Sequence, residues 1–276
     1  MRCQWKELLS ILPGWIADML NSEHQDQLNE IRLRLNQPPE LVSGGNRCML
    51  KEKVKQEDLN FCIHVASKYS PWSAATLAQG FLTSAGGHRI GVCGQTVCRN
   101  GLVTGFQSIQ SLCIRVARDI PGIATKAVTD SSVLIIGPPG WGKTTLLRDY
   151  IRQLSLKGKH VAVVDERGEL FPGSNFLDGV PADIITGCTK EQGIEITLRT
   201  MGPEVIAVDE ITAEADCTAL IKAGWCGVKV VATAHATSRT DLLTRPVYRP
   251  LITSGIFDKL IILQQDKSWR TERMVV

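Results

Sequence analysis

The sequence lacks any long hydrophobic run, and this bears first on membrane insertion. In its 276 residues the longest uninterrupted apolar runs are of the size of Val133–Ile136. A membrane-spanning helix needs about 20 predominantly apolar residues. The first residues carry charges and Pro13-Gly14 interrupts the apolar stretch that follows, so we also expect no signal peptide. The sequence therefore predicts no membrane insertion, and any contact with a membrane is expected to be peripheral or through a partner.

The cysteines lack the spacing of a zinc or redox site. There are nine of them, an odd number, and none form a Cys-x-x-Cys pair. The closest two, Cys93 and Cys98, flank Gly94-Gln95, which we interpret as a hairpin turn. We expect reduced thiols in a cytoplasm, and no metal or redox role for this pair.

The chain also lacks an excess of one charge. Lys and Arg total 31 and Asp and Glu total 28, which leaves a net charge of +3. Aromatic residues make up 5% and form no regular stripe, and the sequence shows no basic cluster. These absences disfavour a nucleic-acid partner. The hydrophobic content of 43% is that of a globular protein and excludes a disordered chain.

Two regions differ in their pattern, which predicts two domains. Residues 1–120 combine helical segments, such as Trp5–Asn21 with a break at Pro13, with alternating strands and an Asn100-Gly101 hairpin turn. Residues 121–276 alternate short apolar strands with helices, which is typical of a mostly parallel sheet covered by helices. We therefore expect a small N-terminal α+β domain and a larger α/β domain.

A phosphate-binding loop is the strongest motif. The pattern G-x-x-x-x-G-K-[ST] is matched at every fixed position by Gly137-Pro138-Pro139-Gly140-Trp141-Gly142-Lys143-Thr144, and Thr145 follows at the start of a predicted helix. Glycines let successive backbone N–H groups point at phosphate oxygens. Lys143 is expected to face solvent until it meets the β- and γ-phosphates, and Thr144 to offer its hydroxyl to Mg²⁺. The alternative is a glycine turn without a ligand.

A second strand, Val205–Val208, ends in two carboxylates, Asp209 and Glu210. In this position an Asp holds the hydration shell of Mg²⁺, and the following Glu can orient or deprotonate the attacking water. We therefore predict Asp209 as a metal-associated residue and Glu210 as the catalytic base. The alternative is that the pair only caps the next helix.

Two further strands end in polar residues. One closes with Asp165-Glu166 and the other carries Thr233 and His235. Ligands bind at the carboxyl ends of strands in open α/β sheets, so both tips are expected near the nucleotide. We predict a supporting catalytic role for Glu166, and contact with the γ-phosphate for Thr233 and His235. The alternatives are a surface salt-bridge cluster involving Arg167 and a purely structural histidine.

Arginines of the N-terminal region are weaker candidates. Arg32 and Arg34 share one strand face, which is either a solvated sheet face or a source of an arginine for a neighbouring subunit. Arg89, Arg115 and Arg118 are candidates for an arginine supplied in trans, which can add about 10³–10⁵ in rate at a P-loop site.

The whole pattern resembles a known family, the stage III sporulation protein AA ATPases, which are similar to the motor ATPases of type II and type IV secretion. The resemblance runs from about Glu30 to Arg270. The segments that carry it are Glu30–Arg34, Gly86–Gly91, Ser111–Arg118, the phosphate-binding loop, Val164–Glu169, Leu198–Glu204, Val208–Ile211 and Thr233–His235.

The resemblance implies a RecA-like P-loop core and ATP with Mg²⁺ as cofactors. It places Asp165 and Glu166 in an acidic box and His235 in a histidine box, and it gives Arg199 a catalytic position ahead of the second nucleotide motif. Thr212, Ala213 and Thr237 depart from the family pattern, which bears on partner contacts.

The resemblance also implies how the protein works. It implies a ring, expected to be a hexamer, which hydrolyses ATP to energise the channel between mother cell and forespore. The partners are then membrane proteins of that channel, with the ring in the cytoplasm at the mother-cell face of the forespore membrane. The alternatives are a nucleic-acid-directed P-loop ATPase and an ATP-gated scaffold with little hydrolysis.

Overall fold

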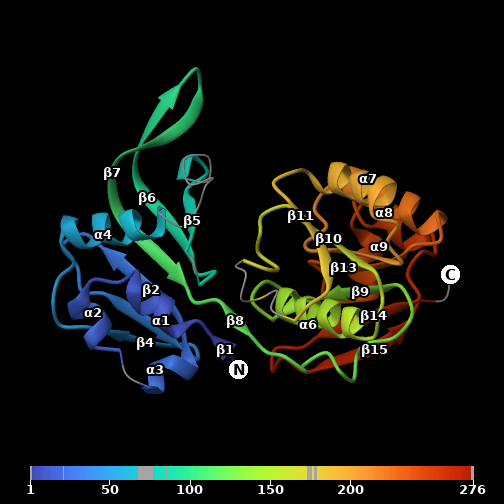
Figure 1. Ribbon diagram of the computed structural model, residues 1–276, viewed down its shortest axis with the longest axis horizontal. Coiled ribbons are helices and arrows are strands. Elements are labelled where there is room, and N and C mark those ends of the chain that lie inside the picture. The colour runs from blue at the N-terminus through green and yellow to red at the C-terminus, as the bar shows by residue number, and fades with distance from the viewer. Residues whose placement is uncertain are drawn as a thin grey trace. The chain divides into compact units, whose positions relative to one another are not determined.

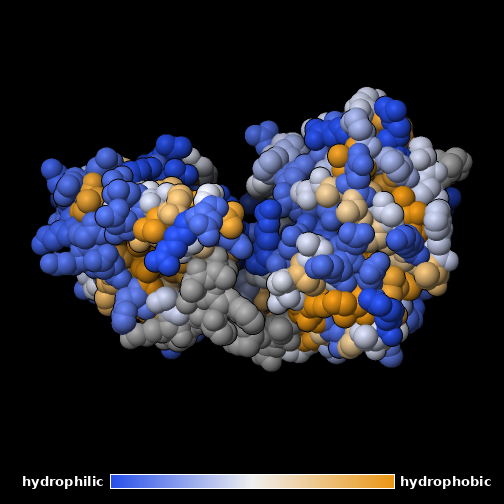
Figure 2. Space-filling model, turned by 90° about the horizontal axis from the view of Figure 1, so that it is seen from above, coloured by the Kyte–Doolittle hydropathy of each residue, from blue (hydrophilic) through white to orange (hydrophobic). Residues whose placement is uncertain are grey.

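Two compact units make up the protein in the computed structural model, which describes residues 2–20, 22–67, 77–84, 86–172, 176 and 179–274. The units are Met1–Asp119 and Ile120–Val276, and each has a hydrophobic core of its own. In the described part of the chain, no helix is both long and apolar enough to cross a membrane. Figure 2 shows that hydrophilic residues cover most of the visible surface of each unit, and that hydrophobic residues form smaller areas within it.

The N-terminal unit is built around a six-stranded antiparallel sheet with the order β4-β3-β2-β7-β6-β5. Its strands are β2 (Leu28–Arg34), β3 (Glu40–Ser43), β4 (Asn46–Met49), β5 (Phe81–Thr83), β6 (Arg89–Arg99) and β7 (Leu102–Arg115). Its other elements among the described residues are the helices α1 (Trp5–Ser10), α2 (Gly14–Asp18), α3 (Ser22–Gln27) and α4 (Gln56–Ser67) and the paired short strands β1 (Arg2–Cys3) and β8 (Arg118–Asp119).

One face of this sheet is apolar and the other is polar, as the alternation in β2 predicts. Ile31 and Leu33 are fully buried and form one core with Leu8 of α1 and Leu59 of α4. Successive residues of a strand point to opposite faces, so Arg32 lies on the face away from these helices. The helices thus cover one side of the sheet.

The hairpin of β6 and β7 turns at Asn100-Gly101, as the sequence predicts, and both turn residues have positive φ. In Figure 1 its end extends beyond the other strands. The interpretation of Gly94-Gln95 as a turn is wrong, because both residues lie within β6 and the pairing there is irregular. A Cβ at Gly94 would lie 2.0 Å from the Ser108 carbonyl oxygen, so this glycine permits a close approach of two backbones.

The C-terminal unit contains a seven-stranded sheet with the order β11-β10-β12-β13-β9-β14-β15. All neighbouring strands are parallel except β15, which is antiparallel to β14. The strands are β9 (Val133–Ile136), β10 (Val161–Asp165), β11 (Ala182–Thr186), β12 (Val205–Val208), β13 (Lys229–Ala234), β14 (Lys259–Leu263) and β15 (Trp269–Arg273). The helices are α6 (Lys143–Leu156), α7 (Lys190–Thr200), α8 (Glu214–Trp225), α9 (Arg239–Thr244) and α10 (Arg249–Thr253).

Helices cover both faces of this sheet, which is why its central strands are continuous apolar runs. All four residues of β9 and of β12 are buried. Leu134 and Ile136 pack with residues of α7, α8, α9 and α10 in one cluster. Helix α6 lies outside that cluster and contacts β9, β10 and β13 on the other face.

Candidate active site

Three parallel strands bring the predicted motifs to one edge of the C-terminal sheet. They lie in the order β12-β13-β9, and their carboxyl ends point the same way. The phosphate-binding loop follows β9, Asp209 and Glu210 follow β12, and His235 follows β13. Strand β10, which ends at Asp165, lies beyond β12 and is therefore farther from the loop.

Backbone conformation explains the glycines of the loop. Gly140 and Gly142 have φ of 78° and 98°, in the left-handed region that L side chains rarely adopt, and Gly142 caps α6. A Cβ at Gly137 would lie 3.1 Å from that of Leu263, so space is short there as well. The loop therefore has the open backbone cradle at a helix N-terminus that suits phosphate oxygens.

Lys143 is buried, which corrects the expectation that it faces solvent. Its Nζ atom donates to the carbonyl oxygens of Gly137 (2.8 Å) and Pro138 (3.0 Å) and lies 3.0 Å from Nδ1 of His235. These three acceptors match the three donors of an ammonium group, which is why the side chain folds back onto its own loop. Burial lowers the pKa of Lys143, although the nearby carboxylates of Asp209 and Glu210 oppose this.

Asp209 joins the phosphate-binding loop to the tip of β12. The Thr144 hydroxyl donates to Asp209 Oδ2 at 2.7 Å, and the Thr233 hydroxyl of β13 donates to Oδ1. The two residues predicted to hold Mg²⁺, Thr144 and Asp209, are therefore in direct contact. A hydroxyl beside a carboxylate at this position is a donor set that fits Mg²⁺.

Thr233 also fixes the backbone of Glu210. Its hydroxyl accepts the Glu210 N–H at 2.7 Å, and its carbonyl oxygen accepts the N–H of Ile211 at 2.9 Å. Glu210 has φ of 53°, which for a residue with a side chain costs about 1–2 kcal/mol. The two bonds from a fully buried threonine hold this conformation in place.

The Glu210 carboxylate has a histidine and an arginine as partners. Oε1 lies 3.1 Å from Nε2 of His235, and Oε2 lies 3.8 Å from the Arg167 guanidinium. The Lys143 ammonium has only donors, so Nδ1 of His235 accepts and Nε2 carries the proton that is donated to Glu210. His235 thus links the P-loop lysine to the predicted base.

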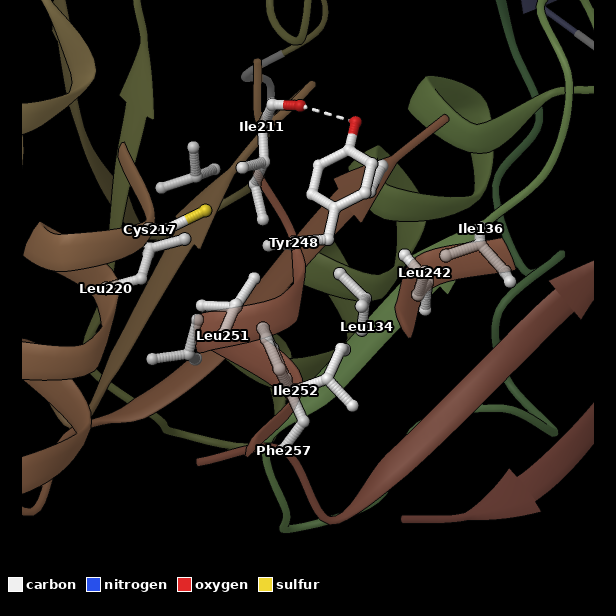
Figure 3. Packing of buried hydrophobic residues seen from close by; sticks show 14 of the residues in the cluster. Leu134, Ile136, Ile211, Cys217, Leu220, Leu242, Tyr248, Leu251, Ile252 and Phe257 are labelled. Atoms are coloured by element: carbon white, nitrogen blue, oxygen red, sulfur yellow. Dashed lines mark hydrogen bonds between the residues drawn. The ribbon is translucent and has the colours of Figure 1, made fainter. Parts of the chain in front are cut away.

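Tyr248, which was not predicted from the sequence as a site residue, supports the backbone that follows Glu210. The Tyr248 hydroxyl donates to the Ile211 carbonyl oxygen at 3.0 Å, and its ring packs among Leu242, Leu251 and other residues of the core (Figure 3). Burial raises the pKa of Tyr248, so the hydroxyl keeps its proton and remains a donor. No local motif marks such a residue, because the contact depends on tertiary packing.

The acidic pair at the tip of β10 has other partners. The Asp165 carboxylate accepts the backbone N–H groups of Glu169, Leu170 and Phe171, and burial raises its pKa to about 6 against the effect of those bonds. Glu166 forms an ion pair with the buried Lys190 at 2.6 Å. Asp165 therefore holds the loop after β10 in place. Among the described residues, Glu166 pairs with Lys190 and makes no hydrogen bond or ion pair with Asp209 or Glu210.

Arg199 and Trp141 make few polar contacts with the other predicted site residues. Arg199 lies on α7 with an exposed side chain, and among the described residues its polar contacts are to Glu195 alone. Trp141 is half-buried in the loop, and its backbone N–H donates to the Pro138 carbonyl oxygen at 3.4 Å. The remaining loop residues, Pro139 and Thr145, lie exposed and half-buried at the same edge.

Comparison with known proteins gives one family across nearly the whole chain. The family model described as sporulation stage III, protein AA, matches residues 3–274. The stage III sporulation protein AA of Bacillus subtilis (strain 168) is 35% identical, in an alignment that covers 95% of this chain and 91% of that protein.

Solved structures of two ATPases are similar in fold. The Legionella pneumophila ATPase DotB has a TM-score of 0.62 at 18% identity, with 95% of this chain and 80% of that chain covered. The pilus retraction motor PilT, solved with bound ADP, has a TM-score of 0.60 at 16% identity, with 86% and 74% covered. The predicted fold class is confirmed: a RecA-like α/β core with a mostly parallel sheet, preceded by a smaller α+β part.

Proposed function

Since the chain belongs to the sporulation stage III protein AA family, we propose that it is an ATPase that acts in endospore formation. The observation that carries the proposal is the contact of Thr144 with Asp209 at 2.7 Å. It joins the phosphate-binding loop to the acidic tip of β12, and both are needed to hold a nucleotide with its metal ion.

Each residue of the site has a role in this proposal. The amides of residues 137–144 and the N-terminus of α6 hold the phosphates. Lys143 leaves the carbonyl oxygens of its own loop and pairs with the β- and γ-phosphates. Thr144 and Asp209 hold Mg²⁺, which when bound neutralises charge on the phosphates.

The water that attacks the γ-phosphate is oriented by Glu210 in this proposal. The proton on His235 Nε2 holds the Glu210 carboxylate, and the Thr233 hydroxyl holds its backbone. When Lys143 moves to the phosphates, Nδ1 of His235 loses its donor, so His235 can respond to nucleotide binding. Glu166, which is paired with Lys190, has a supporting role at most.

We further propose that the protein works as a ring, a homo-hexamer in the cytoplasm at the mother-cell face of the forespore membrane, where it energises a transport channel made of membrane proteins. The fold shared with the pilus retraction motor PilT supports a motor function. Of the three candidate trans arginines, Arg118 donates to the carbonyl oxygens of Gln25 and Leu28, so Arg115, whose side chain is exposed, is a better candidate than Arg118.

Two measurements test this proposal. Calorimetry with Mg-ATP should give saturable binding to the purified protein, and Lys143→Ala should weaken it at least about a hundredfold while the melting curve stays cooperative. Sedimentation with a non-hydrolysable ATP analogue should show a higher-mass species. Unchanged ATP affinity in the variant contradicts the assigned site, and a monomer at high concentration with nucleotide bound contradicts the ring.

A further inference from the structure

The open face of the N-terminal sheet collects positive charge that the linear sequence does not reveal. Cross-strand partners share a face, and the register links Arg32 with Glu40 and Arg89 with Arg115. Apart from Arg99 at the far end of the β6–β7 hairpin, the charged residues that the register places on this face are Arg32, Arg34, Arg47, Arg89, Arg115, Glu30 and Glu40. Without Arg99, these five arginines exceed the two glutamates by three positive charges.

A hollow of about 240 Å³ lies on this face. Its lining includes Arg32, Arg34, Gly80, Gly91, Ser111 and Cys113. Gly91 stands between Phe81 and Cys113 in the cross-strand row and has no side chain, which helps to keep the hollow open. A Cβ at Gly91 would make ordinary contacts with Cys113 at 3.7 and 3.8 Å, so this position accommodates a Cβ, and a longer side chain would extend into the hollow that Gly91 lines.

The two arginines of the hollow keep hydrogen-bond donors for a ligand. Among the described residues, Arg32 bonds to Glu30 only through Nε, and Arg34 bonds to Glu40 only through Nη1. A guanidinium has five N–H donors, so most of them remain available on both side chains. Ser111 adds a hydroxyl to the same lining.

We propose that this hollow binds a phosphate monoester group, held between Arg32 and Arg34. Guanidinium forks match phosphate oxygens in geometry, and the excess positive charge of the face favours a doubly charged group over a single carboxylate. The source of the phosphate is either a free phosphorylated small molecule or a lipid headgroup. All residues that line the hollow belong to the N-terminal unit, whereas the phosphate-binding loop belongs to the C-terminal unit.

A nucleic-acid backbone fits this face less well. Single-strand binding depends on aromatic side chains on which bases stack. Phe81 is the one aromatic residue that the register places on this face within the described strands, and Arg89 already lies over its ring at 4.2 Å. The hollow therefore favours an isolated phosphate group.

Binding of inorganic pyrophosphate to the full-length protein tests the proposal. The Lys143→Ala background weakens binding at the phosphate-binding loop, and residual binding there would appear equally in every variant. Arg32→Gln and Arg34→Gln should each weaken binding by about tenfold or more. Arg47→Gln, which removes the same charge on the same face outside the hollow, should change it less than about twofold.

Gly91→Leu separates the hollow from the general charge of the face, because it keeps every arginine and fills the space. It should abolish pyrophosphate binding while the melting curve stays cooperative. If Gly91→Leu misfolds, the comparison of Arg34→Gln with Arg47→Gln still decides. Equal losses in those two variants, or no loss in either, overturn the proposal.

Flotation with lipid vesicles distinguishes a lipid headgroup from a free phosphorylated molecule as the source of the phosphate group. Flotation with phosphatidylcholine vesicles that contain phosphatidic acid, but not with phosphatidylcholine alone, supports a headgroup if Gly91→Leu and Arg34→Gln abolish it. Pyrophosphate binding without flotation supports a free phosphorylated molecule. Binding of neither probe contradicts the proposal, as does binding of a single-stranded oligonucleotide alone.

Discussion

The Nζ atom of Lys143 lies 3.0 Å from Nδ1 of His235. This contact connects the phosphate-binding loop to the strand that follows Asp209 and Glu210 in the chain. Because Nε2 of the same ring bonds to Glu210 at 3.1 Å, one imidazole joins the phosphate-binding lysine to the predicted base. We expect a site of this kind to couple the arrival of a phosphate to the position of the Glu210 carboxylate, the residue that we predict to activate water.

Replacement of His235 tests this coupling. In His235→Ala the Glu210 carboxylate loses its hydrogen-bond donor, while the backbone cradle for the phosphates is intact. We expect ATP affinity to change less than about threefold and kcat to fall about tenfold, which is part of the 10²–10⁴ that a general base contributes. Steady-state kinetics and calorimetry measure the two effects separately. A large loss of affinity with unchanged kcat would instead make His235 a phosphate-binding residue.

Thr233 offers a test in which stability and activity should change together. Thr233→Val keeps the shape of the side chain but removes the bonds to Asp209 and to the Glu210 N–H. An unsatisfied buried donor costs about 1–3 kcal/mol, and Glu210 is no longer held in its left-handed conformation. We expect a lower free energy of unfolding and a kcat about tenfold lower.

The matched control is Thr233→Ser, which retains the hydroxyl. It should recover most of the turnover and lose only the packing of one methyl group. If both variants behave alike in chemical denaturation and in turnover, the hydroxyl is not what positions Glu210.

Asp165 gives the protein a pH-dependent stability of a specific sign. Its pKa is about 6 in the folded protein and about 3.9 when unfolded, so between these values the folded state binds more protons. The free energy of unfolding therefore falls as pH rises from about 4 to 6, by roughly 3 kcal/mol from this group. Below pH 4 the contribution of Asp165 to the free energy of unfolding is fully present.

Urea denaturation across this pH range measures the effect. In Asp165→Asn the group no longer titrates, so the difference between the two proteins should shift in favour of the variant as the pH rises. A constant difference between pH 4 and pH 7 contradicts a raised pKa for Asp165.

Much of the site could be predicted from the sequence because it is encoded locally. The spacing of Gly137, Gly142 and Lys143 is a continuous motif, and an apolar strand that ends in Asp209-Glu210 indicates a sheet edge. The parallel-sheet pattern then brings the strand tips together. The expected orientation of Lys143 was wrong, because its acceptors depend on the loop conformation and on His235, which is distant in sequence.

Other features depend on pairing that a single sequence does not reveal. Lys190 is the partner of Glu166, and no spacing rule connects a helix start with that strand tip. The arginines on the open face of the N-terminal sheet come together only through the register of separate strands. A sequence without a basic cluster can therefore still fold into a protein with a basic sheet face. The local sequence around Gly94 indicates a turn, because the close contact of Gly94 with Ser108 is a tertiary feature that the sequence does not show.

The central claim is that Glu210, and not Glu166, activates the water in ATP hydrolysis. Steady-state ATP turnover of Glu210→Gln and Glu166→Gln, measured side by side at saturating Mg-ATP, tests it most directly. We predict that Glu210→Gln retains ATP affinity and loses about 10²–10⁴ in kcat, while Glu166→Gln loses less than about tenfold. Continued hydrolysis by Glu210→Gln together with a severe loss in Glu166→Gln would contradict this account and place the base on β10.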